Sequence, residues 1–187
     1  RNKAPISEVL KVHFKDVHRV LEIGSGTGQH AVYFSQVIPW LHWQCSDQGT
    51  DLSHLNARLH REESERLPPA VPLDVTSDTW PDRQFDAVYS ANTAHIMSWA
   101  MVCAMFKGVG QCLDNTGLFI LYGPFRYGEK HTAPSNAQFD LQLKHRDPAM
   151  GIRDALEIEQ QASISGLRLE QDIAMPANNR ILIFCRD

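Results

Sequence analysis

Residues 20–30 read Val20-Leu21-Glu22-Ile23-Gly24-Ser25-Gly26-Thr27-Gly28-Gln29-His30, an apolar run with one acid followed by three alternating glycines. The pattern predicts a buried strand, a tight turn and the start of a helix. Glycine suits such a turn because the chain bends sharply and because a ligand can approach bare backbone. An ordinary strand-to-helix connection can also use glycine, so the surrounding residues decide whether a ligand is expected.

The glycine spacing distinguishes two kinds of nucleotide-binding turn. A dinucleotide fingerprint, G-x-G-x-x-G, needs its third glycine at position 29, but Gln29 stands there and the glycine comes at Gly28. The G-x-G-x-G spacing after two apolar residues and Glu resembles the first motif of class I S-adenosylmethionine (SAM) methyltransferases. That resemblance implies SAM as the cofactor, bound at Glu22, Gly24, Ser25, Gly26 and Gly28. Position 29 and the lack of a Tyr-x-x-x-Lys pair disfavour a nicotinamide-dependent oxidoreductase.

Composition places the chain among ordinary globular proteins. Its 187 residues are 43% hydrophobic and 21% charged, and 18 Lys and Arg against 22 Asp and Glu give a net charge of −4. Basic residues are scattered singly, which disfavours nucleic acid as a partner and leaves a small molecule or a protein open. No apolar run is long enough to cross a membrane, and four widely spaced cysteines fit reduced thiols, so we expect a cytoplasmic protein.

Periodicity predicts strands and helices in alternation. The expected strands are residues 20–23, 41–46, 70–73, 85–90, 118–122, 167–173 and 181–185. The expected helices are 6–14, 30–37, one through residues 52–59, one through residues 101–109, 139–143 and 156–164.

This order predicts an α/β fold with a doubly wound, mostly parallel seven-stranded sheet of the Rossmann-like type. Parallel strands need crossover helices, whereas the last two strands have none between them and should form an antiparallel hairpin. We expect one domain over residues 1–187, with a polar substrate lid inserted around 123–154.

Acidic residues follow three successive predicted strands, at the edge where such sheets bind ligands. Asp47 is placed to accept hydrogen bonds from ribose hydroxyls, and Asp74 to accept them from the adenine amine, with Val75 against the ring. Glu22 is expected to hold the turn through backbone N–H groups and to add negative potential near the sulfonium. One acid at a strand end also fits a helix cap, but three favour a cofactor site.

The fourth strand ends in Ala91-Asn92-Thr93-Ala94, close to the best candidate for a catalytic base. Asn92 is expected at both the cofactor and the reacting centre, and His95 is the candidate base because imidazole titrates near neutral pH. An equally weighted alternative has His95 capping the next helix or packing beside Trp99. The segment lacks the Asn/Asp-Pro-Pro-aromatic element of exocyclic-amine methyltransferases. No H-x-x-x-H pair or histidine–carboxylate cluster occurs, so we expect no catalytic metal.

Polar and aromatic residues beyond the fifth strand are the candidates for substrate binding. Arg146 and Arg153 suit a carboxylate or phosphate, although pairing with Asp147 and Asp154 is at least as compatible with the sequence. Aromatic residues here also fit a plain core, and the asparagine pair fits a left-handed turn. The predicted substrate residues are Trp99, Tyr122, Tyr127, Asn136, Arg146, Arg153, Asn178 and Asn179.

A more specific resemblance covers nearly the whole chain. It rests on Arg1-Asn2, Pro5-Ile6, residues 22–30, Trp43, Ser46-Asp47, Leu73-Asp74-Val75, Trp80-Pro81, Ala91-Asn92, His95-Ile96, Trp99, residues 122–125, Ser135-Asn136, Phe139-Asp140, residues 146–148, residues 151–154 and residues 175–179. These motifs resemble a functionally obscure, methyltransferase-like family once named only as a domain of unknown function. The resemblance implies a class I fold and SAM binding but no substrate. Cys45 stands where that pattern has proline.

Two functions follow from these observations. The first is a SAM-dependent methyltransferase that acts on a small molecule. The second is a non-catalytic SAM-binding or protein-interaction module, because fold alone does not establish catalysis. An enzyme should have a second cavity beside the cofactor, whereas a partner-binding module should expose an apolar patch.

Overall fold

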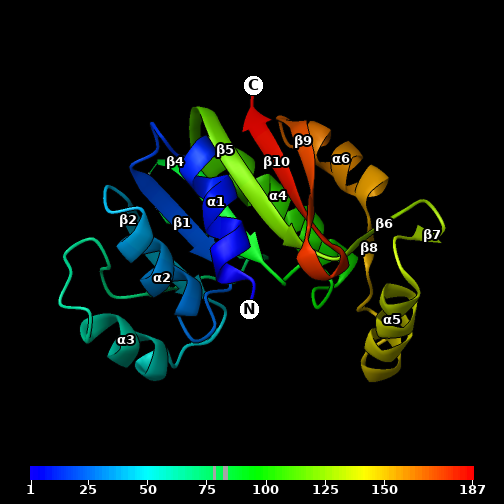
Figure 1. Ribbon diagram of the computed structural model, residues 1–187, viewed down its shortest axis with the longest axis horizontal. Coiled ribbons are helices and arrows are strands. Elements are labelled where there is room, and N and C mark those ends of the chain that lie inside the picture. Colours follow the sequence, from blue (N-terminus) through cyan, green and yellow to red (C-terminus); the bar gives the residue numbers. More distant parts are fainter. Residues whose placement is uncertain (78, 82–83) are drawn as a thin grey trace.

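The computed structural model describes residues 1–77, 79–81 and 84–187, and a seven-stranded sheet lies at its centre (Figure 1). The strand order is β3-β2-β1-β4-β5-β10-β9. The parallel strands are β1 (Arg19–Ile23), β2 (His42–Asp47), β3 (Val71–Pro72), β4 (Phe85–Ala91) and β5 (Leu113–Gly123). Strand β10 (Asn179–Arg186) runs antiparallel to both β5 and β9 (Leu167–Met175). The doubly wound sheet with its C-terminal hairpin is therefore confirmed.

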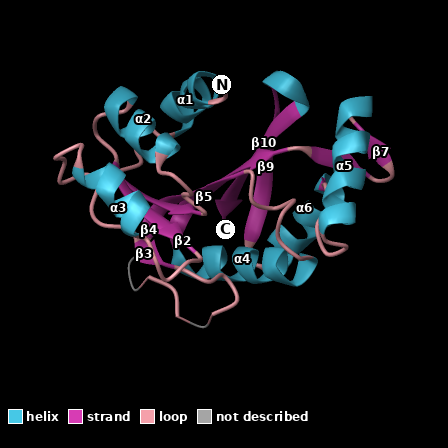
Figure 2. Ribbon diagram, turned by 90° about the horizontal axis from the view of Figure 1, so that it is seen from below, coloured by secondary structure: helices cyan, strands magenta, loops and turns pink. Residues whose placement is uncertain are grey.

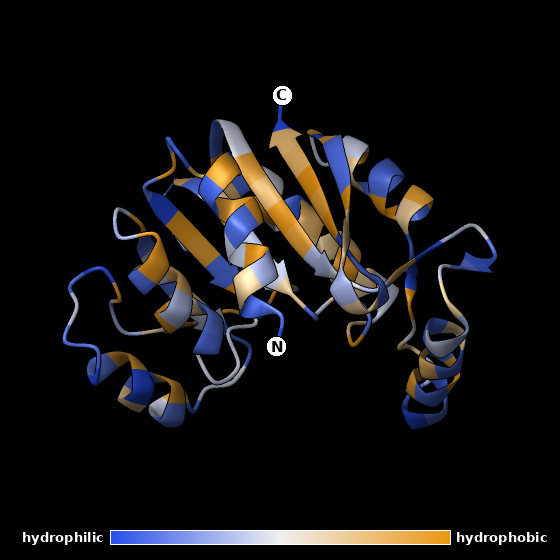
Figure 3. Ribbon diagram, in the orientation of Figure 1, coloured by the Kyte–Doolittle hydropathy of each residue, from blue (hydrophilic) through white to orange (hydrophobic). Residues whose placement is uncertain are grey.

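Helices cover both faces of the sheet (Figure 2). One face carries α1 (Lys3–His13), α2 (Gln29–Val37) and α3 (Ser53–His60), and the other carries α4 (Trp99–Cys112) and α6 (Ala155–Ile164). Each layer has its own core, and the central strands between them are strongly hydrophobic (Figure 3). Burial on both faces explains why these strands read as continuous apolar runs.

The local sequence explains why helix α4 forms where it does. Ser98 caps α4 by accepting a hydrogen bond from Met101 N at 3.2 Å. Val102, Met105, Phe106 and Val109 then recur at helical spacing, and all four are buried against the sheet.

The edge where ligands are expected is set by strand register. Strands β1 and β4 pair in parallel, from Val20 with Ala87 to Ile23 with Ser90. The two strands therefore end next to each other at the same edge of the sheet. The glycine turn and Asn92 therefore emerge side by side. Among the described residues, no helix has both the length and the apolarity that a bilayer crossing requires.

The segment after β5 contains structure that periodicity did not predict. It forms a small sheet from β6 (Phe125–Tyr127), β7 (Lys130–His131) and β8 (Arg153–Asp154), in the order β7-β6-β8. Helix α5 (Pro134–Arg146) is longer than the expected 139–143 and begins at a proline, which favours a first helical turn. Figure 1 shows α5 set apart from the helices that cover the sheet.

Candidate functional site

The glycine turn combines close packing with bare backbone. Gly24 has φ of 73°, and a Cβ there would lie 2.7 Å from Thr93 Cγ2, so only glycine lets the turn pack on the loop after β4. Gly26 has φ of 55°, and no atom lies within 4 Å of the position its Cβ would take. Gly26 therefore presents backbone to open space, as a ligand-binding turn requires.

Hydrogen bonds tie this turn to the end of β2. Ser25 N donates to Ser46 O at 2.9 Å, and Ser46 N donates to Ser25 Oγ at 3.1 Å. Gly26 N donates to Asp47 Oδ2 at 2.7 Å. The carboxylate expected to bind ribose is thus in direct contact with the turn expected to face the cofactor.

Four strand ends enclose a cavity of about 120 Å³ beside the turn. Its polar rim includes Asp47, and buried apolar side chains form much of its wall. The residues that matter here are Gly24, Asp47, Leu73, Val75, Thr93 and Met97. Val75, predicted to contact adenine, lies on the cavity wall, so the structure brings the turn, the second-strand acid and the apolar slot together.

Asp74 lies exposed next to Val75, at the end of β3. Its Oδ1 accepts hydrogen bonds from Thr76 N at 2.9 Å and from Thr76 Oγ1 at 2.7 Å. These bonds lower the pKa of Asp74, so the group is an anion with one oxygen not used by Thr76.

Glu22 lies beneath the turn rather than on the cavity, and it is only 3% exposed. Its Oε2 accepts hydrogen bonds from Trp43 Nε1 at 2.9 Å and Cys45 Sγ at 3.7 Å. The expectation that Glu22 holds the turn through backbone N–H groups is wrong, because its described partners are side chains. Burial raises the pKa of Glu22 to about 7, against the opposing effect of hydrogen bonds from Trp43, Ser25 and Cys45.

His95 lies just past β4 and is 7% exposed. Burial, helped by the charge of Arg153, lowers the pKa of His95 to about 4, so the imidazole is neutral at pH 7. The cap of α4 is Ser98, so the alternative that His95 caps this helix is wrong. The ring instead packs edge-on against Phe139 of α5, with 5.5 Å between centroids.

A second cavity, of about 310 Å³, lies at the end of β4. Asn92 lines this cavity and the next residue, Thr93, lines the other. Asn2, Asn92, Tyr122, Met175, Ala177 and Asn179 are among its lining residues. Of the predicted substrate residues, Tyr122 and Asn179 therefore face a common cavity.

Asn178 and Asn136 join the turn at this cavity to helix α5. Asn178 lies in the short turn Pro176–Asn178 between β9 and β10, and its carbonyl accepts a hydrogen bond from Asn136 Nδ2 at 3.0 Å. Asn136 is buried and does not line the cavity. Its hydrogen bond holds the turn that does.

Other predicted substrate residues have internal partners. Arg153 donates to the carbonyls of Ala94, Met97 and Ala149, and Tyr127 donates to Asp172 on β9. We therefore reassign both side chains to holding the 123–154 segment. Arg146 is exposed at the last turn of α5. Trp99 is exposed at the first turn of α4 and is not among the residues that line either cavity.

The alternative pairing of Arg153 with Asp154 is also wrong. Asp154 accepts from Leu156 N at 2.9 Å as the cap of α6, and its other oxygen lies 3.6 Å from Arg126 Nη1. Arg153 instead donates its hydrogen bonds to backbone carbonyls, including those of Ala94 and Ala149.

Several lining residues were not predicted from the sequence. Asn2 lines the second cavity, and Gln48 and Met97 line the first. Gln48 directly follows the end of β2, a positional signal that sequence reasoning could have used. The N-terminal Asn2 has no such signal.

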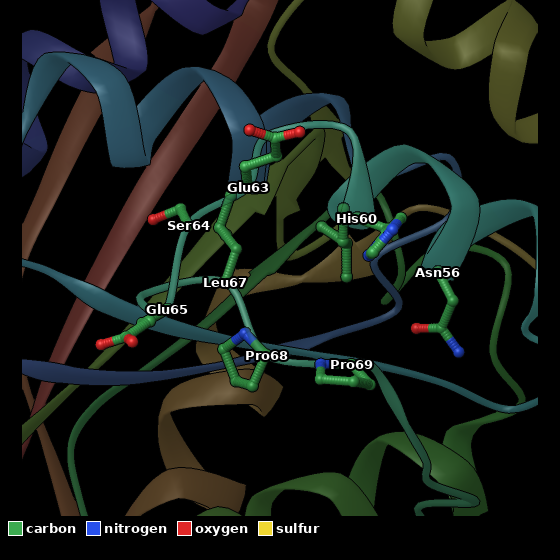
Figure 4. Close-up of a pocket in the computed structure, with 9 residues that line it drawn as sticks. Asn56, His60, Glu63, Ser64, Glu65, Leu67, Pro68 and Pro69 are labelled. Carbon is green, nitrogen blue, oxygen red and sulfur yellow. The ribbon is translucent and has the colours of Figure 1, made fainter.

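A wider cavity of about 750 Å³ lies elsewhere, between α3 and the loop that follows it (Figure 4). Asn56, His60, Glu63, Leu67 and Pro69 line it, and none of the predicted site residues does. Within the described ranges, no group of three or more His, Cys, Asp or Glu is placed to hold a metal, and the expectation of metal-free chemistry stays a prediction.

Comparisons with known proteins agree with this architecture. The profile of a family described as "Protein of unknown function (DUF938)" matches residues 1–186. Mitomycin 7-O-methyltransferase MmcR is similar in structure, with a TM-score of 0.82 and 18% identity over 93% of this chain and 50% of that one. An O-methyltransferase family protein from Burkholderia thailandensis has a TM-score of 0.85 and 14% identity over 99% and 56%.

PigF, solved with S-adenosylhomocysteine (SAH), has a TM-score of 0.83 and 14% identity over 98% of this chain and 61% of that one. At these identities the likeness shows the fold alone. The chain spans between 50% and 61% of the length of these three structures.

Proposed function

The chain belongs to the DUF938 family, and we propose that it is a SAM-dependent methyltransferase that acts on a small molecule. The observation that carries the proposal is the convergence on one cavity of Gly24 from the turn, the apolar Val75 and Asp47, whose carboxylate also accepts from the bare backbone of Gly26. The structural neighbours named as methyltransferases support it, and those named as O-methyltransferases favour oxygen as the acceptor atom.

The residues at this cavity fit a nucleoside with a cationic sulfur. Asp47 has lone pairs beyond its bond to Gly26 N and would accept from ribose hydroxyls. Val75 and Leu73 offer apolar contact to a flat ring, and the anionic Asp74 beside them would accept from its amine. Asp47 places negative charge beside the turn, and Glu22 adds negative charge beneath it once pH exceeds its raised pKa of about 7.

When bound, SAM supplies an electrophilic methyl group. The residues of this chain have to align the acceptor and keep water away. When the acceptor atom is an oxygen, a base is also needed to take its proton. His95, neutral at pH 7 and nearly buried, is our candidate for that base, and Asn92 is our candidate for orienting the acceptor.

The second cavity favours catalysis over a binding module. A protein that only binds SAM needs one cavity, whereas an enzyme needs a place for the acceptor next to it. The 310 Å³ cavity beside Asn92 meets that need. The 123–154 segment, joined to its turn by Asn136, is our candidate for a lid over the acceptor.

Isothermal titration calorimetry with SAM and with SAH tests the cofactor assignment. We expect saturable binding of both ligands, and Gly26→Val should abolish it because its side chain would fill the open space above the turn. Absence of heat at high micromolar SAM would reject the proposal.

A further inference from the structure

The wall of the second cavity is assembled from four distant parts of the chain. They are the N-terminal residues, Asn92 after β4, Tyr122 at the end of β5 and the turn from Met175 to Asn179.

Strained backbone gathers at this cavity. Asn92, Ala177 and Asn178 are three of the five non-glycine residues with positive φ in the described ranges, at 57°, 59° and 58°. Such a conformation is unfavourable for a residue other than glycine, and it persists only where its surroundings hold it. Asn92 N donates to Tyr122 O at 2.9 Å, and Asn178 O accepts from Asn136 Nδ2 at 3.0 Å. The wall is therefore held in shape at a cost in stability, as binding sites often are.

The cavity is lined by neutral hydrogen-bonding groups. They are the side-chain amides of Asn2, Asn92 and Asn179 and the hydroxyl of Tyr122, and Arg1 is the one charged residue of the lining. Burial raises the pKa of Tyr122, against hydrogen bonds from Asn2 and Asn179, so the phenol stays protonated. The lining holds no carboxylate to neutralise a cation, so it suits a ligand without positive charge.

Gly123 follows the lining residue Tyr122 in sequence, and its missing side chain leaves room for one atom close to Asn92. A Cβ on Gly123 would meet His95 Nδ1 at 3.8 Å and Asn92 Oδ1 at 4.0 Å, and no closer atom. The two polar atoms therefore face the same stretch of bare backbone. Phe139 packs against the ring of His95.

Building on the proposed function, we propose that this cavity holds the ring of the methyl acceptor, a small uncharged phenol. Its hydroxyl reaches past the lining residue Asn92 to the space over Gly123, between Asn92 Oδ1 and His95 Nδ1. The acceptor oxygen bonds to the methyl carbon as the carbon–sulfur bond of SAM breaks. The electron pair of that bond stays on sulfur, and the phenolic proton passes to His95 and then to water.

The phenol class follows from size and acidity. A cavity of about 310 Å³ holds a single-ring molecule. His95, with its pKa lowered to about 4, is a weak base, and it suits a hydroxyl that is already acidic, with a pKa near 10 as in tyrosine, better than an aliphatic alcohol.

Nuclear magnetic resonance with 4-methylphenol tests this placement without requiring turnover. In protein saturated with SAH, 4-methylphenol at millimolar concentration should shift the Gly123 backbone amide and the side-chain amides of Asn92 and Asn179. Toluene, which lacks the hydroxyl, and benzylammonium, which is a cation, should bind at least about tenfold more weakly.

The matched variant is Gly123→Ala, whose methyl group would make only ordinary contacts in the folded protein. This variant should bind 4-methylphenol about tenfold or more weakly than the parent, while its affinity for SAH should stay within about twofold. If 4-methylphenol leaves those resonances unchanged, or binds Gly123→Ala equally well, the acceptor site is wrong while the cofactor site stands. If SAH itself does not bind, both proposals fall.

Discussion

The glycine-turn edge and the 123–154 segment use polar residues in opposite ways. At the edge, Gly26 faces open space and Asp47 reaches the cavity with lone pairs to spare. In the segment, Arg153 is surrounded by carbonyls, and Asp140 accepts from Ile152 N and Lys144 Nζ, each at 2.7 Å. Both regions look equally polar in sequence. The lesson is that partners, rather than composition, separate residues that bind a ligand from residues that hold a loop.

The largest effect that tests this contrast is expected at Arg153. Arg153→Ala removes hydrogen bonds to three backbone carbonyls and should lower the free energy of unfolding by about 3–4 kcal/mol. Arg146→Ala, at an exposed position of the same segment, should change it by less than about 0.5 kcal/mol. Urea unfolding measures both. Equal effects of the two substitutions would contradict a structural role for Arg153.

Glu22 tests the other region through pH. Its pKa is raised to about 7 in the folded protein, so its contribution to stability is full below its ordinary value of 4.5 and is lost as pH rises through 7. Glu22→Gln keeps a neutral side chain, and at about pH 8 it should be more stable than the parent by about 3 kcal/mol. Near pH 4.5 the two should be similar.

Unfolding in urea at both pH values checks this, with Glu65→Gln, at an exposed position, as the control. His30 and His95, whose pKa values are lowered to about 4, also lose stability for the fold in acid. This loss is the same in variant and parent, so the difference between the two isolates the effect of Glu22. A Glu22→Gln variant with the parent's pH dependence would refute the buried-carboxyl explanation.

Asp47 should affect ligand binding more than stability. Asp47→Ala removes the proposed ribose acceptor. It should reduce the free energy of SAM binding by about 2 kcal/mol, which raises Kd roughly 30-fold. Asp51→Ala, which removes exposed hydrogen bonds from the backbone and side chain of Ser53, should bind SAM normally. Calorimetry decides between them, and normal SAM binding by Asp47→Ala would mean that the ribose assignment is wrong.

The smallest effect is expected at the contact between α5 and the β9–β10 turn. Asn136→Ala removes the hydrogen bond to Asn178 O and should cost about 1 kcal/mol of stability, with SAM affinity unchanged. The neighbouring Ser135→Ala, at an exposed position, should be neutral. Thermal unfolding with calorimetry at 25 °C measures both, and weakened SAM binding in Asn136→Ala would show that the two regions are coupled.

Much of the fold was accessible from sequence because its signals are local. The glycine turn, the strand before it and the acid after β2 lie within a short stretch, and the parallel register then places them at one edge. Helix α4 is preceded by its own cap, Ser98, and carries its own apolar spacing.

The rest depended on contacts between distant residues. Phe125 pairs with Arg153 in strands of two or three residues, which are too short to show periodicity. Arg153 binds backbone carbonyls, which leave no pattern in side chains. The second cavity joins Asn2, Asn92, Tyr122 and Asn179, and no local motif links positions so far apart.

The central claim is that the glycine turn and the strand-end acids form one cofactor site. Titration of ¹⁵N-labelled protein with SAH, followed by backbone amide shifts, tests it most directly. We predict saturable shifts at Gly24, Gly26, Val75 and Thr93, with the amides of α5 unchanged. Shifts gathered instead around His60 and Leu67, at the cavity of Figure 4, or no saturable shifts at all, would contradict it.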